Sequence, residues 1–488
     1  MNSYKKDPIS QIDLINTDIP TTSIYLDNTN TTIPTSNHSP ESPETKASEA
    51  ISDLLINVES ANTSDIGLTL KKNALNDSPA QKGNKKATKK PTNSKPLAKQ
   101  SNPLDNNKVN QQSKPNSSCN SESQVYDNYV QKIRANLNKD LHLKLLTRRL
   151  LESAGFFTAL ETNIYKPSYL KSFKHEQVSD IDVLGIRFDI DLRNTMVVVE
   201  CKSGEDHSLD ELLKLKGMMD YLNANYGYLV KTTISNNARE LGSGLKISTF
   251  SHPEIAQLIL SQENFNGGLP KWLETETDNY IHEKALLECA SGLFPQTVKY
   301  LSRDLWNNPD HTNIHNICVL LSKYQGTDVL HRREVRYLFL QLVINISIFI
   351  LKHCAYALAK SLSNATECLL ELSFGGPKEK REREILFDKV NQLLAAEGKQ
   401  PSNFIPDYTN SIIDLSLMFL KTPSAAKDVP RCLDYYCKAS IVSYKGLDIN
   451  DINIHFSNIT LKLTKDILIM ATKLGGQNTS VFNDLLNK

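Results

Sequence analysis

Apolar positions in the middle of the chain change from helical to extended spacing. Residues 127–154 repeat apolar side chains at the spacing of a helix, and Gly155 follows as a typical C-terminal stop. Three extended apolar runs come next, at 156–164, 180–190 and 195–201. The tetrapeptide "DLRN" between the last two runs favours a hairpin turn. The pattern therefore predicts one helix followed by three strands.

A second alternating stretch continues this domain. Residues 208–224 have helical spacing, with Ser208 as N-cap and Glu211 three residues later, which is a capping box. The next four segments have the patterns of a strand, a helix, a strand and a helix: "YGYLVKT", "SNNARELG", "GLKISTF" and "HPEIAQLILSQ". The order αβββαβ, with a trailing αβα, predicts an α/β domain in which helices flank a sheet.

From about residue 270 the chain changes to longer apolar stretches with a helical period. They lie at 280–305, 311–323, 333–372, 379–397, 407–421, 427–443 and 450–474. Breaks rich in Gly, Pro and Asn separate them, and no repeat of fixed length is present. Residues 270–488 are therefore predicted to form an all-α domain.

The N-terminal region has a different composition. Tyr4 and Tyr25 are its only aromatic residues, and Asn, Ser, Thr, Pro and Lys dominate it. Such a segment buries too little apolar surface to offset the entropy of the chain. We therefore predict a disordered tail at 1–122, the α/β domain at 123–263 and the all-α domain at 270–488.

The net charge of +1 hides a basic run in this tail. Between residues 71 and 114, eleven lysines are opposed only by Asp77 and Asp105. A run of this kind binds nucleic acid, serves as a nuclear address or keeps the tail solvated. Solvation is the favoured interpretation, because no arginine or aromatic residue is interleaved to stack on bases.

Cysteine usage and hydropathy bear on location. Eight cysteines are scattered without a CxxC pair or zinc-ligand spacing, as expected in a reducing, intracellular environment. The N-terminus has no continuous apolar segment of a secretory signal. The most apolar run, at 337–351, is shorter than the ~18–20 residues of a membrane span and contains Gln341 and Asn345. We therefore expect a buried helix there, no membrane association, and a cytoplasmic, nucleoid or nuclear location.

The run "VVVECKSG" at 197–204 carries the candidate chemistry. Three valines predict a strand that is buried on both faces, yet this strand ends in charged residues. Because side chains alternate along a strand, Glu200 and Lys202 share one face. Cys201 points to the other face, where core packing is its expected role.

The preceding strand supplies acidic partners. Asp180 and Asp182 share a face of it, and the hairpin brings one of them beside Glu200. Two carboxylates suit a hard divalent cation such as Mg²⁺, which keeps several waters. Such an ion polarises a phosphoryl oxygen and lowers the pKa of bound water, and the ammonium of Lys202 can stabilise charge that develops on the phosphate. The constellation indicates a site that cleaves phosphodiesters.

Together, the segments "SDIDVLGI" and "VVVECKSG" resemble the motif of the PD-(D/E)XK nucleases, and the resemblance covers about residues 126–255. It implies a restriction-endonuclease-like αβββαβ core with Asp182, Glu200 and Lys202 as catalytic residues. It also implies that Asp182 and Glu200 hold Mg²⁺ or Mn²⁺. The chain departs from the motif at Ile181, which stands where the family has a proline.

Polar residues on two helices extend the resemblance. Many members carry a polar residue on the helix after the motif that helps to hold the site, and Lys214 or Lys216 matches it. The first helix often supplies another acidic residue; Asp140 and Glu152 are the candidates, and the pattern favours neither.

We therefore predict a metal-dependent nuclease that acts on DNA in preference to RNA, with a helical targeting or regulatory domain. A homodimer and a protein partner bound by the helical domain remain open. The alternative is a catalytically inactive nuclease-fold scaffold that binds nucleic acid or a protein partner.

Overall fold

A computed structural model describes residues 118–165, 177–204, 208–265, 276–326, 328–360, 362–442 and 451–486. The first 117 residues, which are nearly all of the predicted disordered tail, lie outside the described residues. Most of the segment between the two predicted domains, 264–269, also lies outside them. The division of the chain at this segment therefore stays a prediction.

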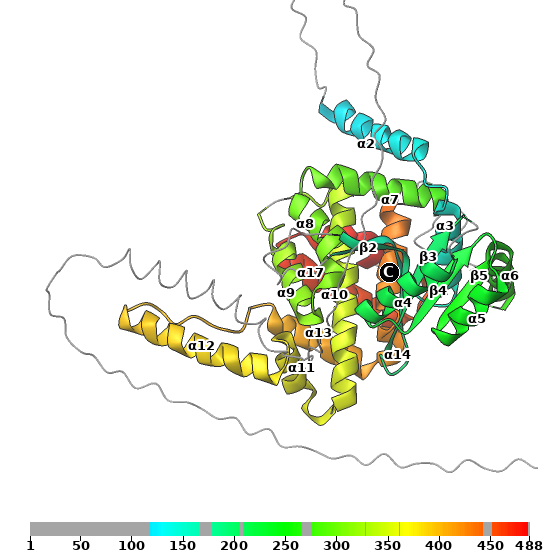
Figure 1. Cartoon of the computed structure of the whole chain (residues 1–488). Coiled ribbons are helices and arrows are strands. Elements are labelled where there is room, and N and C mark those ends of the chain that lie inside the picture. The colour runs from blue at the N-terminus through cyan, green and yellow to red at the C-terminus, as the bar shows by residue number, and fades with distance from the viewer. Residues whose placement is uncertain are drawn as a thin grey trace, which may run out of the picture. The chain divides into compact units, whose positions relative to one another are not determined.

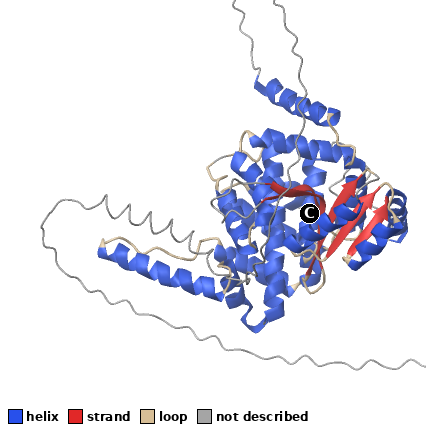
Figure 2. Cartoon of the chain, in the orientation of Figure 1, coloured by secondary structure: helices blue, strands red, loops and turns tan. Residues whose placement is uncertain are grey.

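Five strands form one mixed sheet in the order β1-β2-β3-β4-β5. The strands are drawn in red in Figure 2, with helices around them. The strands are β1 (Phe157–Tyr165), β2 (Gln177–Phe188), β3 (Asn194–Lys202), β4 (Tyr226–Lys231) and β5 (Ile247–Ser251). The first three pair antiparallel, and β3, β4 and β5 pair parallel. All five predicted strands are confirmed within a few residues, and so is the α/β class of this region.

Helices cover both faces of the sheet (Figure 1). On one face lie α3 (Leu141–Ser153) and α6 (His252–Phe265), and on the other lie α4 (Ser208–Leu222) and α5 (Asn236–Gly244). In β3, Val197 and Val199 face the first pair of helices, and Val198 packs with the core that includes α4. The three consecutive valines are therefore buried on both faces, as the sequence predicted.

The predicted continuous helix at 127–154 is wrong, because it is divided into α2 (Ser118–Ala135) and α3. Asn136 and Asn138 lie in the break, and both side chains bond to nearby backbone: Asn136 donates to Lys132 O, and Asn138 accepts from Asp140 N. Such local bonds compete with the helical ladder. The break places Asp140 at the N-terminus of α3.

The C-terminal region is mostly helical, as predicted. Its helices are α7 (Glu276–Ser291), α8 (Pro295–Lys299), α9 (Asp310–Ser322), α10 (Arg333–Lys360), α11 (Ala365–Ser373), α12 (Pro377–Ala396), α13 (Thr409–Lys421), α14 (Pro423–Ala426), α15 (Val429–Cys437), α16 (Ile452–His455), α17 (Asn458–Leu474) and α18 (Asn483–Leu486). The apolar stretch 333–372 forms two helices, α10 and α11.

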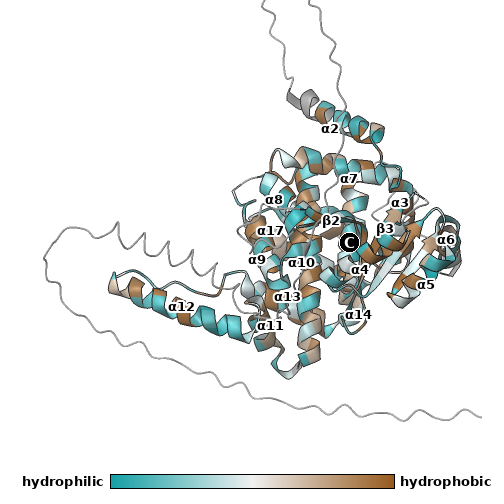
Figure 3. Cartoon of the chain, viewed as in Figure 1, coloured by the Kyte–Doolittle hydropathy of each residue, from teal (hydrophilic) through white to brown (hydrophobic). Residues whose placement is uncertain are grey.

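Helix α10 is the centre of this region. By length and composition it could cross a membrane, but 83% of its most apolar window is buried inside the protein. The prediction of a buried helix at 337–351 is confirmed. By contrast, α12 has no buried residue, and hydrophilic residues predominate in its first half (Figure 3).

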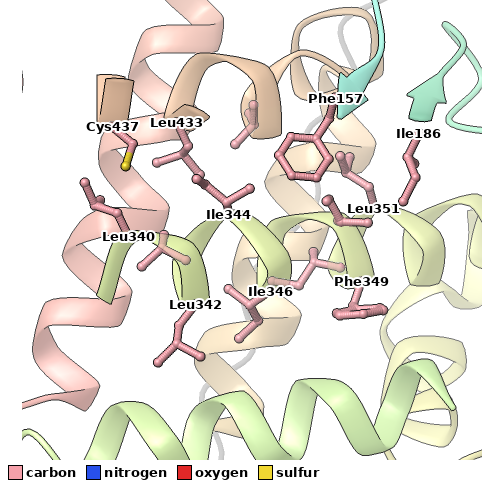
Figure 4. Close-up of a cluster of buried hydrophobic side chains, with 14 of the residues drawn as sticks. Phe157, Ile186, Leu340, Leu342, Ile344, Ile346, Phe349, Leu351, Leu433 and Cys437 are labelled. Atoms are coloured by element: carbon pink, nitrogen blue, oxygen red, sulfur yellow. The ribbon is translucent and has the colours of Figure 1, made fainter. Parts of the chain in front are cut away.

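The sheet and the C-terminal helices share a hydrophobic core. Phe157 of β1 and Ile186 of β2 lie in one cluster with Ile344 and Leu351 of α10 and Leu433 of α15 (Figure 4). All described residues belong to one compact unit. The α15 helix also contacts β1 directly.

Candidate active site

The candidate site lies where the pairing of β2 with β3 ends. The last paired residues are Val183 and Val199, and Asp182 and Glu200 come next on the two strands. There Asp182 Oδ2 accepts a hydrogen bond from Cys201 N at 2.7 Å. This carboxylate takes the position that a strand carbonyl would have, so it is fixed against the end of β3.

The structure brings Asp182, Glu200 and Lys202 together. Lys202 Nζ lies 2.8 Å from Glu200 Oε1 and 3.8 Å from Asp182 Oδ2. Both carboxylates are buried, whereas the side chain of Lys202 is 34% exposed. Asp180, the other aspartate on β2, is exposed to solvent. Of the two aspartates, Asp182 is therefore the one held in the cluster.

The electrostatics of Glu200 are those of a desolvated carboxylate. Burial raises the pKa of Glu200, and the charge of Asp182 raises it further against the opposing effect of Lys202. Oxygen Oε1 is buried and lies near Lys202 and, at 3.6 Å, near Lys214, but neither contact has hydrogen-bond geometry. Oxygen Oε1 of Glu200 therefore has lone pairs that could coordinate a cation.

Lys202 stays charged in this setting. Burial alone would lower the pKa of its ammonium, but the close contact with Glu200 and the charge of Asp182 raise that pKa above its ordinary value. A cation fixed at the rim of the cluster and partly open to solvent is placed to meet an anionic ligand.

The donor set fits a hard cation that takes few protein ligands. Asp182 and Glu200 offer carboxylate oxygens, and Mg²⁺ binds one or two carboxylates and completes its shell with water. Zinc requires three or four protein ligands. Within the described part of the chain, no group of three or more His, Cys, Asp and Glu residues has the arrangement of a metal site.

The two lysines expected on the helix after the motif differ in position. Lys214 of α4 lies near Glu200, whereas Lys216 pairs with Asp220 on the same helix. Glu211, expected as part of a capping box, forms an ion pair with Lys231, whose side chain is fully buried. This pair joins the start of α4 to the end of β4.

The two acidic candidates of the first helix, Asp140 and Glu152, also lie in different surroundings. Asp140 Oδ1 accepts from Ser203 N at 2.8 Å, next to Lys202. Burial opposes ionisation of Asp140, but the bonds from Ser203 and the nearby lysines lower its pKa. Glu152 instead lies among buried charges with Arg148 and Lys438. The asparagines around residue 136–138 were the sequence signal that could have placed Asp140 at a helix start.

Two residues that the sequence did not single out also belong to the cluster. Lys144 of α3 is buried, and its Nζ lies 2.8 Å from Asp182 Oδ1 and 3.2 Å from Glu161 Oε1. Glu161 lies on β1 with a left-handed backbone, at φ +52°. For Lys144, the available sequence signal was a lysine among the apolar positions of "LHLKLL". For Glu161, nothing in the sequence pattern indicated a place in the cluster.

Cys201 packs in the core, as predicted. It lies in the hydrophobic cluster between the sheet, α3 and α6, and burial raises the pKa of its thiol well above the ordinary value. A thiol in that state is not a nucleophile.

Comparison of the chain with protein-family models, with curated proteins and with solved structures finds no match.

Proposed function

We propose that this protein is a Mg²⁺-dependent nuclease of the PD-(D/E)XK type, with a restriction-endonuclease-like core. One observation carries the proposal: Lys202, whose side chain is 34% exposed, lies against both Asp182 and Glu200 at the end of β3. The element order α3-β1-β2-β3-α4-β4 is the αβββαβ order expected of that fold. One fold can support many activities, so the proposed activity follows from the residues of the site.

Each residue has a separate role in the proposed reaction. Asp182 and Glu200 would hold Mg²⁺ or Mn²⁺, which supplies Lewis-acid polarisation of the phosphoryl group and a more acidic water. The Cys201 N–H keeps the Asp182 carboxylate oriented. Lys202 faces the phosphate and stabilises the negative charge that grows on it.

The proposed substrate is nucleic acid, with DNA preferred to RNA, and the proposed location is inside the cell. The seven cysteines whose side chains the structure describes are all free, as in a reducing compartment. The C-terminal helices would target or regulate the site. Both a homodimer and a protein partner on these helices are compatible with this function.

A second candidate is an inactive nuclease-fold scaffold that binds nucleic acid or a protein partner. The observation that favours it is the ion pair of Lys144 with Asp182, because a lysine already neutralises a carboxylate that the enzyme would need for its cation. The two candidates differ in whether the site binds Mn²⁺ or Mg²⁺ at all.

The experiment is cleavage of plasmid, linear and single-stranded DNA, and of RNA, by the full chain with Mg²⁺, Mn²⁺ or EDTA. The substitution Asp182→Asn keeps an oxygen for the Cys201 N–H but removes the charge. We expect it to lower cleavage at least ~100-fold, the scale for losing a preorganised charged group. Asp180→Asn is the matched control on the same strand and should change cleavage little.

Lys202→Met separates metal binding from chemistry. It should abolish cleavage and leave Mn²⁺ binding in place, because the ammonium acts on phosphate and not on the ion. If Asp182→Asn cuts at the wild-type rate while its melting temperature is unchanged, the active-site assignment is wrong. If the wild-type chain binds no divalent cation, the scaffold is the better description.

A further inference from the structure

Lys144 bridges two carboxylates from different strands. Its ammonium lies 2.8 Å from Asp182 Oδ1 and 3.2 Å from Glu161 Oε1, and its side chain is buried. Because the other oxygen of Asp182 accepts from Cys201 N, both oxygens of Asp182 already have partners inside the protein. A cation that binds Asp182 must therefore compete with Lys144.

Glu161 is held in an unusual backbone conformation at this point. It lies inside β1, yet its φ is +52°, a left-handed value that is unfavourable for any residue except glycine. The pairs Leu160–Val183 and Thr162–Ile181 flank it, so Glu161 and Asp182 stand opposite each other across the two strands. Strain of this kind persists where the surroundings hold it, and it gathers at functional sites.

The second oxygen of Glu161 is anchored from the C-terminal region. Lys284 Nζ of α7 lies 2.9 Å from Oε2, and the Tyr280 hydroxyl donates to the same atom at 2.8 Å. Burial opposes ionisation, but Lys284, Tyr280 and Lys144 lower the pKa of Glu161 to about 2. Glu161 is therefore a charged acceptor at neutral pH, and its Oε1 lies 3.2 Å from Lys144 Nζ.

We propose that Lys144 is an internal counter-ion for Asp182, and that a divalent cation binding at the site transfers Lys144 to Glu161. This inference rests on the proposed function. Without a cation, an unpaired Asp182 would be a desolvated charge, and Lys144 keeps it in place. With a cation, the ammonium has a second carboxylate within reach, so its charge is not left buried alone.

The arrangement makes opposite predictions for the two partners. Lys144→Met removes the competitor, so Mn²⁺ should bind the full-length protein at least ~10-fold more tightly. Glu161→Gln removes the alternative acceptor, so Lys144 stays on Asp182 and Mn²⁺ should bind about 3- to 10-fold more weakly. A purely structural role for these residues would shift both affinities in the same direction.

The measurement is Mn²⁺ titration by calorimetry, with melting temperature recorded with and without Mn²⁺. Lys144→Met should melt lower than the wild type without metal and recover when Mn²⁺ is added, because the ion replaces the missing charge. Lys352→Met is the control; it breaks an ion pair with Asp310 far along the chain and should leave Mn²⁺ affinity unchanged.

Unchanged or weaker Mn²⁺ binding by Lys144→Met overturns the counter-ion inference, and so does tighter binding by Glu161→Gln. The proposed nuclease activity is tested separately, by measuring cleavage by the wild-type chain. If the wild type cuts DNA with Mg²⁺ and Lys144→Met binds Mn²⁺ as the wild type does, only the counter-ion inference fails. If neither the wild type nor any variant binds Mn²⁺, both proposals fail.

Discussion

Helix α3 contributes to two clusters of lysine or arginine with carboxylates, and the two clusters differ in kind. Near its N-terminus, Lys144 reaches Asp182 in the candidate site. One and two turns further on, Arg148 and Glu152 face the C-terminal helices, where Lys438 lies 3.2 Å from Glu152 Oε1. The first cluster opens to solvent through Lys202, whereas Arg148, Glu152 and Lys438 are all buried and form what we call the closed cluster.

The closed cluster joins the sheet to the C-terminal region. Lys438 also lies 2.6 Å from Asp434 Oδ2, and the Thr158 hydroxyl of β1 donates to Glu152 Oε1 at 2.6 Å. Burial alone would raise the pKa of Glu152, but Lys438 and Arg148 lower it. The carboxylate of Glu152 thus has its cations inside the protein.

The difference teaches which features separate a functional charge cluster from a structural one. Ion pairs are present in both, and each contains a buried carboxylate oxygen without a hydrogen bond, on Glu200 in one and on Glu152 in the other. Three features distinguish the candidate site. The side chains of Lys202 and Lys214 are partly exposed to solvent, and the backbone of Glu161 is left-handed. Access to solvent and stored strain are therefore the better criteria.

The largest expected effect on stability belongs to the closed cluster. Lys438→Met removes the cation that pairs with Asp434 and leaves Glu152 with Arg148 alone, which should lower the free energy of unfolding by about 3–5 kcal/mol. Denaturant unfolding measures the change. Cleavage per folded molecule should stay at the wild-type level, because Lys438 pairs with Glu152 and Asp434, which belong to the closed cluster and not to the candidate site.

The matched control for Lys438 is an exposed pair. Lys378→Met breaks the i,i+4 pair with Glu382 on α12 and should change stability by less than ~0.5 kcal/mol. Equal, small losses for both substitutions would mean that the closed cluster does not stabilise the junction. A loss of cleavage in folded Lys438→Met would remove the distinction between the two clusters.

Glu276 of α7 makes the closed cluster sensitive to pH. Burial, followed by the charge of Glu152, raises the pKa of Glu276 to about 8. An unfolded glutamate titrates near ~4.3, so the folded state binds more protons between these values and stability falls as pH rises from about 4.3 to about 8. Glu276→Gln removes the titration.

This prediction is tested by denaturant unfolding from pH 5 to pH 8.5. The variant and the wild type should be similar at pH 5, where the carboxyl is neutral. At pH 8.5 the variant should be more stable by about 1–2 kcal/mol, which allows for partial relaxation around the charge. Parallel pH profiles for the two proteins would show that Glu276 is not desolvated by this cluster.

The strands and the three motif residues could be predicted from the sequence because they depend on short-range patterns. A valine run buried on both faces, followed by Glu200 and Lys202, is visible within eight residues. The preference for Asp182 over Asp180 also follows from its place deeper in an apolar strand. The restriction-endonuclease-like fold and the activity stay predictions.

The remaining features depend on contacts between distant parts of the chain. Lys144 reaches Asp182 and Glu161 only because α3 packs against β1 and β2. Glu161 is anchored only because α7 supplies Tyr280 and Lys284. A left-handed glutamate leaves no local signal, since glutamate has no preference for that backbone. The break between α2 and α3 could have been predicted from the sequence, because asparagines favour helix ends over helix interiors.

The smallest expected effect concerns Lys214 and Lys216, which lie on the same helix but at different distances from the candidate site. Lys214 is 51% exposed and lies 3.6 Å from Glu200 Oε1, whereas Lys216 pairs with Asp220. If nucleic acid occupies the open end of the site, Lys214→Ala should weaken binding only a few-fold and flatten the plot of log affinity against log salt by about one unit, as for one lost phosphate contact. Lys216→Ala should leave that slope unchanged. Fluorescence anisotropy with labelled DNA at several salt concentrations measures both, and identical slopes for the two variants would place the nucleic acid away from Lys214.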